Sequence, residues 1–391
     1  MSKSIIGVAA ALALSAGALS ACGSDDGGAG GDTVIVGAFS PLSGPAVSAS
    51  SGIKATEAAI KKVNDAGGID GVKIEYIVKD DQFNPANTPG VARQLVETDQ
   101  AVFLCGPQGS VPFGAVKDYL AQKKIPTIVN AGAPALAGEY AYLASSPFDG
   151  MGALLAQFSL EDLDAKSVAV VYSDDILGVS SLEGAEAIME ENGKELAAKV
   201  KFDLTGTDFS AQAIQLKASG ADVVLMPSAQ ANTAGPIINA AEKLGYKPIW
   251  GLSYSSQNKT LVELTKGAID GRAYFVTPYI TTESEIGAEY SETLQKYAPE
   301  VEANSGATIA GYTIGEMCVE VLKQAVEEAG GAPSAADIQK VMDTMQIDSD
   351  YIKGIDWTPD EHGGAKAAQV LKLEGGKYIE FKPSQPLPDV S

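Results

Sequence analysis

Few side chains in this sequence could support catalysis, and they are scattered. The only histidine, His362, falls in a predicted turn, where we expect it to be solvated. The pairs Asp80-Asp81 and Asp174-Asp175 each follow a predicted strand, which favours helix capping and solvated loop charge over metal binding or acid–base catalysis. No nucleophile elbow, P-loop, dinucleotide-binding glycine pattern or His-Glu-x-x-His motif occurs. We therefore predict no catalytic residue, metal site or cofactor, and an enzyme is the least favoured alternative.

Main-chain groups offer a clearer binding site. Ser110 follows a strand predicted over residues 101–105 and precedes a helix expected near residues 112–123. Unpaired N–H groups at the start of a helix, together with its dipole, attract an anion. We therefore expect Ser110 to contact an anionic group, with a purely structural N-cap as the alternative.

The chain has three cysteines. Cys105 lies in an apolar run and Cys318 in a helical pattern. Buried free thiols are favoured for these two residues, and a disulfide between them is the alternative.

The third cysteine, Cys22, ends an N-terminal segment that looks like a sorting signal. Lys3 precedes an apolar stretch over residues 5–18, which is too short to span a bilayer. The sequence Leu-Ser-Ala-Cys at residues 19–22 resembles the bacterial lipoprotein box, which implies cleavage before Cys22 and lipid attachment to its sulfur. A plain secretory signal is the alternative. We expect residues 1–21 to be a signal peptide and residues 22–32 a Gly-rich tether, anchoring an extracytoplasmic body to the cell membrane.

Composition indicates a soluble body with more than one core. The chain has 391 residues, 45% of them hydrophobic and 20% charged, with a formal net charge of −22. This length favours two lobes, and the acidity without Lys/Arg clusters argues against nucleic-acid binding.

Strand and helix patterns alternate along the chain. Apolar strands are predicted near residues 33–39, 73–78, 101–105, 125–129, 167–172, 196–202, 221–226, 249–250 and 273–276. Helices of 10 to 15 residues separate most of them, which predicts parallel sheets wound by helices on both faces. Three further helices are expected at residues 285–297, 312–329 and 335–345, then a hairpin over residues 352–382 with its turn at residues 360–364. The predicted fold class is α/β, with two doubly wound parallel-sheet lobes.

Several motifs, in order, resemble the branched-chain amino-acid type of periplasmic binding protein (type I, leucine-binding-like), which serves ABC importers. The most specific is Asn-Asp-Ala-Gly-Gly-Ile-Asp-Gly at residues 64–71. The others are Pro-Leu-Ser-Gly-Pro at residues 41–45, Lys-Asp-Asp at 79–81, a Pro85/Val91/Leu95 pattern, Gly-Pro-Gln-Gly-Ser at 106–110, and residues 353–354 and 356–364.

The resemblance implies two lobes joined by a three-strand hinge, with crossings near Ser145, Tyr279 and Ser349. Lobe 1 would hold residues 33–145 and 280–348, and lobe 2 residues 146–279 and 349–391. A small molecule would bind in the cleft between them, at the carboxyl ends of strands, and the closed form would dock on a membrane permease. Signalling to a membrane receptor is the alternative function. The expected ligand-binding residues are Ser43, Ser110, Ala131, Gly132, Ala133, Leu177, Ala229, Ser253 and Tyr254.

Departures from the family pattern bear on the ligand. The loop at residues 130–133 lacks the usual hydroxyl, and residues 227–229 lack the usual tyrosine. The loop at residues 251–254 lacks the acidic residue that pairs with a ligand ammonium, and an unpaired buried ammonium is costly. We therefore expect a small amino acid or a related carboxylate or amide, with aromatic bodies included. The missing acidic residue counts against an ordinary α-amino acid and favours a carboxylate or amide that lacks the amino group. Leu177, where the family often has an aromatic, would leave room for a bulkier apolar ligand, although a core position is the alternative.

Overall fold

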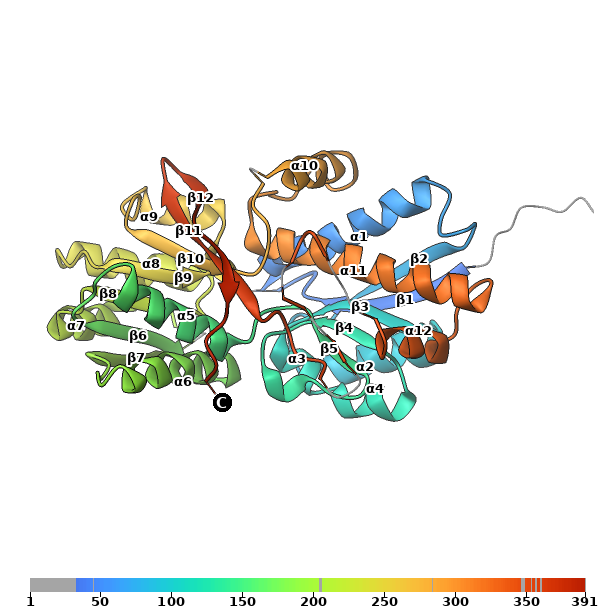
Figure 1. The fold of residues 1–391 in the computed structure, drawn as a ribbon, viewed down its shortest axis with the longest axis horizontal. Helices are drawn as coiled ribbons and strands as arrows, with labels where there is room; N and C mark the ends of the chain where they lie inside the picture. Colours follow the sequence, from blue (N-terminus) through green and yellow to red (C-terminus); the bar gives the residue numbers. More distant parts are fainter. Residues whose placement is uncertain are drawn as a thin grey trace, which may run out of the picture. The chain divides into compact units, whose positions relative to one another are not determined.

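The computed structural model describes residues 33–390 apart from residues 45, 204–205, 283, 346–348, 353, 356 and 359–360. The predicted signal peptide, the tether and Cys22 lie outside the described residues, as do Pro45, Lys353, Asp356 and residues 359–360. All elements below belong to the unit Asp32–Ser391. They form two α/β lobes, each on its own sheet (Figure 1), which confirms the predicted fold class.

The first lobe is built on a five-stranded sheet of order β2-β1-β3-β4-β5, and its strands pair in parallel. The strands are β1 (Thr33–Ser40), β2 (Lys73–Asp80), β3 (Phe103–Gln108), β4 (Thr127–Asn130) and β5 (Ala141–Leu143). The early helices are α1 (Ser50–Asp65), α2 (Thr88–Arg93), α3 (Ser110–Gly114) and α4 (Lys117–Lys123), with short turns at Val47–Ala49, Gln94–Thr98 and Pro134–Leu136. The later helices are α10 (Glu285–Tyr297), α11 (Gly306–Ala329) and α12 (Ala335–Met342). α11 packs on α1, β3 and β4 (Figure 1), although the parallel strands of the second sheet lie between β4 and α11 in the sequence.

The second lobe has a seven-stranded sheet of order β12-β11-β10-β9-β8-β6-β7. Its parallel strands are β6 (Val168–Ser173), β7 (Ala198–Phe202), β8 (Val223–Met226), β9 (Ile249–Ser253) and β10 (Ala273–Thr277). The helices are α5 (Phe148–Glu161), α6 (Ile176–Glu191), α7 (Ser210–Ser219), α8 (Ala231–Lys243) and α9 (Lys259–Thr265), with a short turn at Tyr254–Ser256. The central strand β8 is buried at every position, as expected for a strand covered by helices on both faces.

The C-terminal hairpin lies elsewhere than predicted. Strands β11 (Ala367–Glu374) and β12 (Lys377–Pro386) pair with each other in antiparallel fashion, and β11 also pairs with β10. The turn is Gly375-Gly376, where both residues have positive φ, the conformation that a two-residue hairpin turn requires. The predicted turn near residues 360–364 contains only an isolated bridge between Thr358 and Glu361 within the described residues.

The predicted bounds of the helix over residues 112–123 are also wrong. The chain forms α3, which starts at Ser110 and ends at Gly114, and then the separate helix α4. Val116 between them has φ −127°, outside the helical range. Gly114 favours this break because glycine is a weak helix former.

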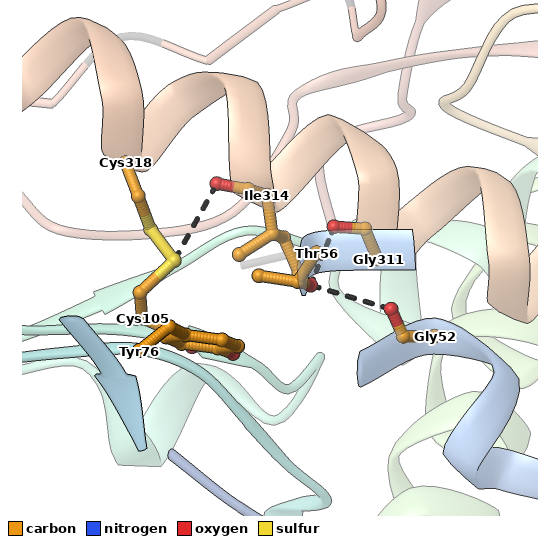
Figure 2. Close-up of a disulfide and its surroundings, with 7 residues drawn as sticks. All are labelled: Gly52, Thr56, Tyr76, Cys105, Gly311, Ile314 and Cys318. Carbon is orange, nitrogen blue, oxygen red and sulfur yellow. Dashed lines mark hydrogen bonds between the residues drawn. A yellow bond between two sulfur atoms is a disulfide. The ribbon is translucent and has the colours of Figure 1, made fainter. Parts of the chain in front are cut away.

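The interpretation of the two buried cysteines as free thiols is wrong. Cys105 of β3 and Cys318 of α11 form a disulfide, with 2.15 Å between the sulfur atoms and 6.1 Å between the Cα atoms (Figure 2). Both residues are fully buried, as expected. Their sequence positions did not reveal the pairing because it depends on α11 returning over the first sheet after the chain has passed through the second lobe.

Candidate functional site

A cavity of about 990 Å³, including its open mouth, lies at the ends of strands from both sheets. From the first lobe, residues at or after the ends of β2, β3 and β4 and at or before the starts of α1 and α11 line it. From the second lobe, the lining comes from residues after β6, β8 and β9 and from the start of α5. These are the carboxyl ends of parallel strands, where doubly wound sheets bind ligands. The lining residues are Ala49, Phe83, Gln108, Gly109, Ser110, Asn130, Ala131, Gly132, Phe148, Leu177, Ser228, Gln230, Ala231, Asn232, Tyr254, Ser255, Asn258, Thr260, Ser305 and Ala307.

The structure brings some of the predicted site residues together at this cavity. Its lining includes Ser110, Ala131, Gly132, Leu177 and Tyr254. These residues come from four different loops or helix starts, so the sheets rather than local sequence place them side by side.

The other four predicted residues do not line the cavity. Ser43 is exposed, and its hydroxyl donates to Asp80 at 2.5 Å. Ala133 and Ala229 are buried in the cores of their lobes. The Ser253 hydroxyl is buried and donates to the Pro227 carbonyl. The loop that holds Ser253 reaches the cavity through Tyr254 and Ser255, but the Ser253 side chain points into the lobe.

The helix start at Ser110 is weaker than expected. Gly109, with φ +97°, occupies the N-cap position and has no side chain to cap the helix. α3 has only five residues, so few peptide dipoles align behind Ser110. Ser110 itself is buried and lines the cavity.

Phe83 is a cavity residue that sequence reasoning missed. Gln82 and Phe83 both have positive φ, and the Phe83 ring lies where a Cβ on Gly109 would stand, so Gly109 allows the close approach. The Asp81 carboxylate holds this loop by accepting from the Phe83 N–H at 2.9 Å and the Thr88 hydroxyl at 3.0 Å. The backbone conformation that places Phe83 depends on these contacts, so no local sequence pattern identifies it.

The two aspartates of this loop differ in environment, which corrects the expectation that both are solvated. Asp81 is fully buried, and desolvation raises the pKa of its carboxyl. For Asp80, desolvation acts to raise the pKa, but hydrogen bonds from Ser43, Gln82 and Leu42 outweigh it and lower the pKa. In the second pair, Asp175 caps α6 as predicted, and Asp174 pairs with Lys201 at 2.7 Å on the surface.

Other missed lining residues are mostly polar and stand at the ends of strands or starts of helices. The Gln108 side-chain oxygen accepts from the Ser40 hydroxyl at 2.9 Å, and the Asn258 oxygen caps α9 at Leu261. Gln230 and Asn232 flank the start of α8, and Ser305 precedes α11. Position after an apolar strand is the signal that could have identified Gln108.

Among the described residues that line this cavity, none has a charged side chain. Asp149 and Asp174 are both outside the lining set. Asp149 accepts from the Gly150 N–H instead. The lining set therefore offers a bound ammonium no carboxylate and a bound carboxylate no cation.

Tyr254 connects the cavity to the segments that run between the two sheets. Its hydroxyl lies 2.6 Å from that of Ser145, and its ring meets Tyr279 edge-on at 5.1 Å. The Tyr279 hydroxyl donates to the Ala144 carbonyl at 3.2 Å. Burial raises the pKa of Tyr254, so the phenol is a neutral hydrogen-bonding group at ordinary pH.

The prediction that His362 is solvated is wrong. Its ring is buried and stacks on Tyr142 with 3.9 Å between the ring centroids, and Nδ1 lies 2.6 Å from the Gly138 carbonyl oxygen. The segment around His362 packs on β5, where the Leu143 N–H donates to the His362 carbonyl. His362 is not part of the cavity lining.

Comparison with known proteins agrees with this architecture. A family model described as "Periplasmic binding protein" matches residues 33–377. The "Leu/Ile/Val-binding protein homolog 3" of Brucella melitensis is 23% identical over 365 residues, 88% of this chain and 93% of that protein.

Two solved structures have closely similar folds. A branched-chain amino-acid ABC transporter protein from Thermus thermophilus with bound valine has a TM-score of 0.81 at 20% identity, covering 91% of this chain and 97% of that one. A fatty acid ABC transporter substrate-binding protein from Thermomonospora curvata also has a TM-score of 0.81 at 20% identity, covering 92% of this chain and 93% of that one.

Among the helices in the described residues, none is both long and apolar enough to cross a bilayer. Because the family model spans most of the chain, the chain belongs to the periplasmic binding protein family, with the type I fold.

Proposed function

We propose that this chain is the extracytoplasmic solute-binding component of an ABC importer, and that it captures a small organic molecule without an ammonium group between its two lobes. The single observation that carries the proposal is a cavity lined from both sheets by uncharged side chains. A ligand that contacts both walls favours the closed arrangement, and a differential affinity of this kind is what shifts a two-state equilibrium.

The remaining parts of the proposal concern location and partner. The lipobox-like segment ending at Cys22 supports a lipid anchor, and family membership supports docking of the closed form on a membrane permease. The segments containing Ser145, Tyr279 and Ser349 would act as the hinge. The contacts of Tyr254 with Ser145 and Tyr279 support this because they join a cavity wall to two of these segments.

A thermal-shift screen followed by titration calorimetry tests the proposal. The panel should contain amino acids, the acids with the same carbon skeletons, and the corresponding amides. We expect at least one compound without an ammonium group to bind with one molecule per chain. At a ligand concentration of one hundred times Kd, it should stabilise the folded state by about 2.7 kcal/mol.

Substitutions in the cavity lining test whether the ligand binds there. Asn130→Ala and Ser228→Ala each remove a polar group from the cavity lining and should weaken binding. Gln295→Ala, on the exposed surface of α10, is the matched control and should keep the parental affinity. Tight binding of an ordinary α-amino acid alone, or equal binding by all three variants, would contradict the proposal.

A further inference from the structure

Phe83 adopts a backbone conformation that is unfavourable for a large side chain. Gln82 and Phe83 both have positive φ, +59° and +57°. The left-handed region is sterically costly for a residue with a Cβ, and it is rare for a bulky one. Asp81 holds the loop in this conformation, because its carboxylate accepts from the Phe83 N–H and its carbonyl accepts from the Asn84 N–H at 3.0 Å. Residues fixed in this way by their surroundings are often found where a ligand binds.

Packing of the first lobe does not account for the position of the Phe83 ring. Within the described residues, Phe83 is partly exposed and is not a member of any buried hydrophobic cluster. The ring lies instead against the loop between β3 and α3, where a Cβ on Gly109 would lie only 2.6 Å from the ring carbon Cζ. The missing side chain of Gly109 leaves the space that the ring fills. The ring therefore forms the cavity wall next to the residue that precedes Ser110.

This ring is suited to select the size of a ligand rather than its head group, because it has no polar atom. Phe83 and Leu177 line the cavity from different lobes and offer apolar walls. Each methylene of a ligand that finds room in such a site raises the affinity roughly fourfold. A methylene that finds no room must displace closely packed atoms, which lowers the affinity. A ring held on a fixed backbone therefore limits the apolar part of the ligand.

We infer that Phe83 is a specificity-determining residue, and that its ring limits the length of the apolar group that the cleft admits, whatever head group the ligand has. This assignment rests on the proposed function, because it names the residue that sets the size of the solute in the same cleft.

Homologous ligand series measure the size limit without assuming a head group. Calorimetric titrations would use straight-chain carboxylates from propionate to octanoate, the primary amides of the same chains, and straight-chain amino acids from alanine to norleucine. In the parent chain, affinity within a series should rise with each methylene up to a limit and then fall. Phe83→Ala should bind the first ligand beyond that limit roughly tenfold more tightly than the parent does. Phe83→Trp, with a larger ring, should move the limit to a shorter chain.

Two further variants separate ligand selection from folding. Phe381→Ala is the matched control, because this exposed ring on β12 packs on Phe158 and Tyr274 of the second lobe and is not in the cavity lining. It should keep the parental size limit. Phe83→Gly removes the ring and also suits the left-handed backbone. It should therefore melt at or above the temperature of Phe83→Ala and admit the same longer ligands.

The possible results distinguish this assignment from the proposed function. The same size limit in the parent, Phe83→Ala and Phe83→Trp, all folded by circular dichroism, would overturn the assignment and leave the importer proposal intact. Loss of all binding in Phe83→Ala but not in Phe381→Ala would also overturn it, because the ring would then supply contact rather than a limit. Absence of binding by every compound to the parent and the variants alike would remove the proposed function together with the assignment.

Discussion

At the residue scale, Asp80 and Asp81 show how neighbouring carboxylates acquire opposite properties. Asp80 accepts hydrogen bonds near the surface, whereas Asp81 is buried beneath the loop that carries Phe83. Hydrogen bonds to a carboxylate favour its charged form, and desolvation disfavours it. The contributions of Asp80 and Asp81 to the free energy of unfolding therefore change with pH in opposite directions.

Carboxyl-detected NMR titration should resolve this difference. We expect Asp80 to titrate below the reference value of 3.8 and Asp81 above it. Asp80 contributes stability above its unfolded pKa that is lost as the pH falls through its lower folded pKa. Asp81 has the opposite sign, because folding becomes less favourable as the pH rises from 3.8 through its raised folded pKa.

Substitution should separate the two contributions. Asp81→Asn should reduce the loss of stability above pH 3.8, and Asp80→Asn should reduce the loss on acidification, both measured by urea unfolding over a pH series. A common titration midpoint for the two carboxyls would contradict this account.

Sequence reasoning at this scale indicated several of the loops that line the cavity but not which side chains enter it. Ser110, Ala131 and Gly132 follow strands whose ends were predictable, so their loops could be placed at one edge of the sheet. Phe83 could not be predicted because its position depends on two left-handed residues and on the space above Gly109. Ser253 was predicted to face the ligand, but its hydroxyl is used inside the lobe.

At the element scale, the contact between α1 and α11 fixes one wall of the cavity. A Cβ on Gly311 would lie 1.9 Å from the Gly52 carbonyl oxygen, and the Thr56 hydroxyl donates to the Gly311 carbonyl at 2.7 Å (Figure 2). The helix backbones can approach this closely only because neither glycine has a side chain. The start of α11 follows Ser305 and includes Ala307, both of which line the cavity.

Gly311→Ala should therefore lower the free energy of unfolding by about 1–3 kcal/mol through overpacking. Gly90→Ala is the matched control, because this helical glycine of α2 has open space around its Cβ position and no positive φ. The control should be neutral or stabilising by about 0.5–1 kcal/mol. Equal effects of the two substitutions in urea unfolding would show that α1 and α11 are not packed as described.

The Cys105–Cys318 disulfide fastens α11 to β3 over a sequence separation of 213 residues. A cross-link between such distant residues restricts the unfolded chain, and its removal typically costs about 2–5 kcal/mol. We expect a reductant, added under conditions that expose the bond, to lower the melting temperature of the parent chain but not of a double variant with Cys105→Ala and Cys318→Ala. An equal response of both proteins to the reductant would contradict the pairing.

At the scale of the whole described chain, the two-lobe α/β fold was predictable from the alternation of buried strands and helices. The disulfide was not predicted, because it joins β3 to α11 only after the chain has passed through the second lobe. The hairpin was placed at the wrong turn, although its actual turn, Gly375-Gly376, is local to the two strands. The absence of an acidic residue after β9 was visible in the sequence. The full uncharged lining was not, because it combines residues from most of the chain length.

Hydrogen–deuterium exchange with and without the tightest-binding small molecule tests the central claim most directly. The account predicts simultaneous protection of cavity segments in both lobes, at residues 108–110 and 130–132 in the first and residues 228–232 and 254–258 in the second. Protection confined to one lobe, or centred on the segment around His362, would contradict it.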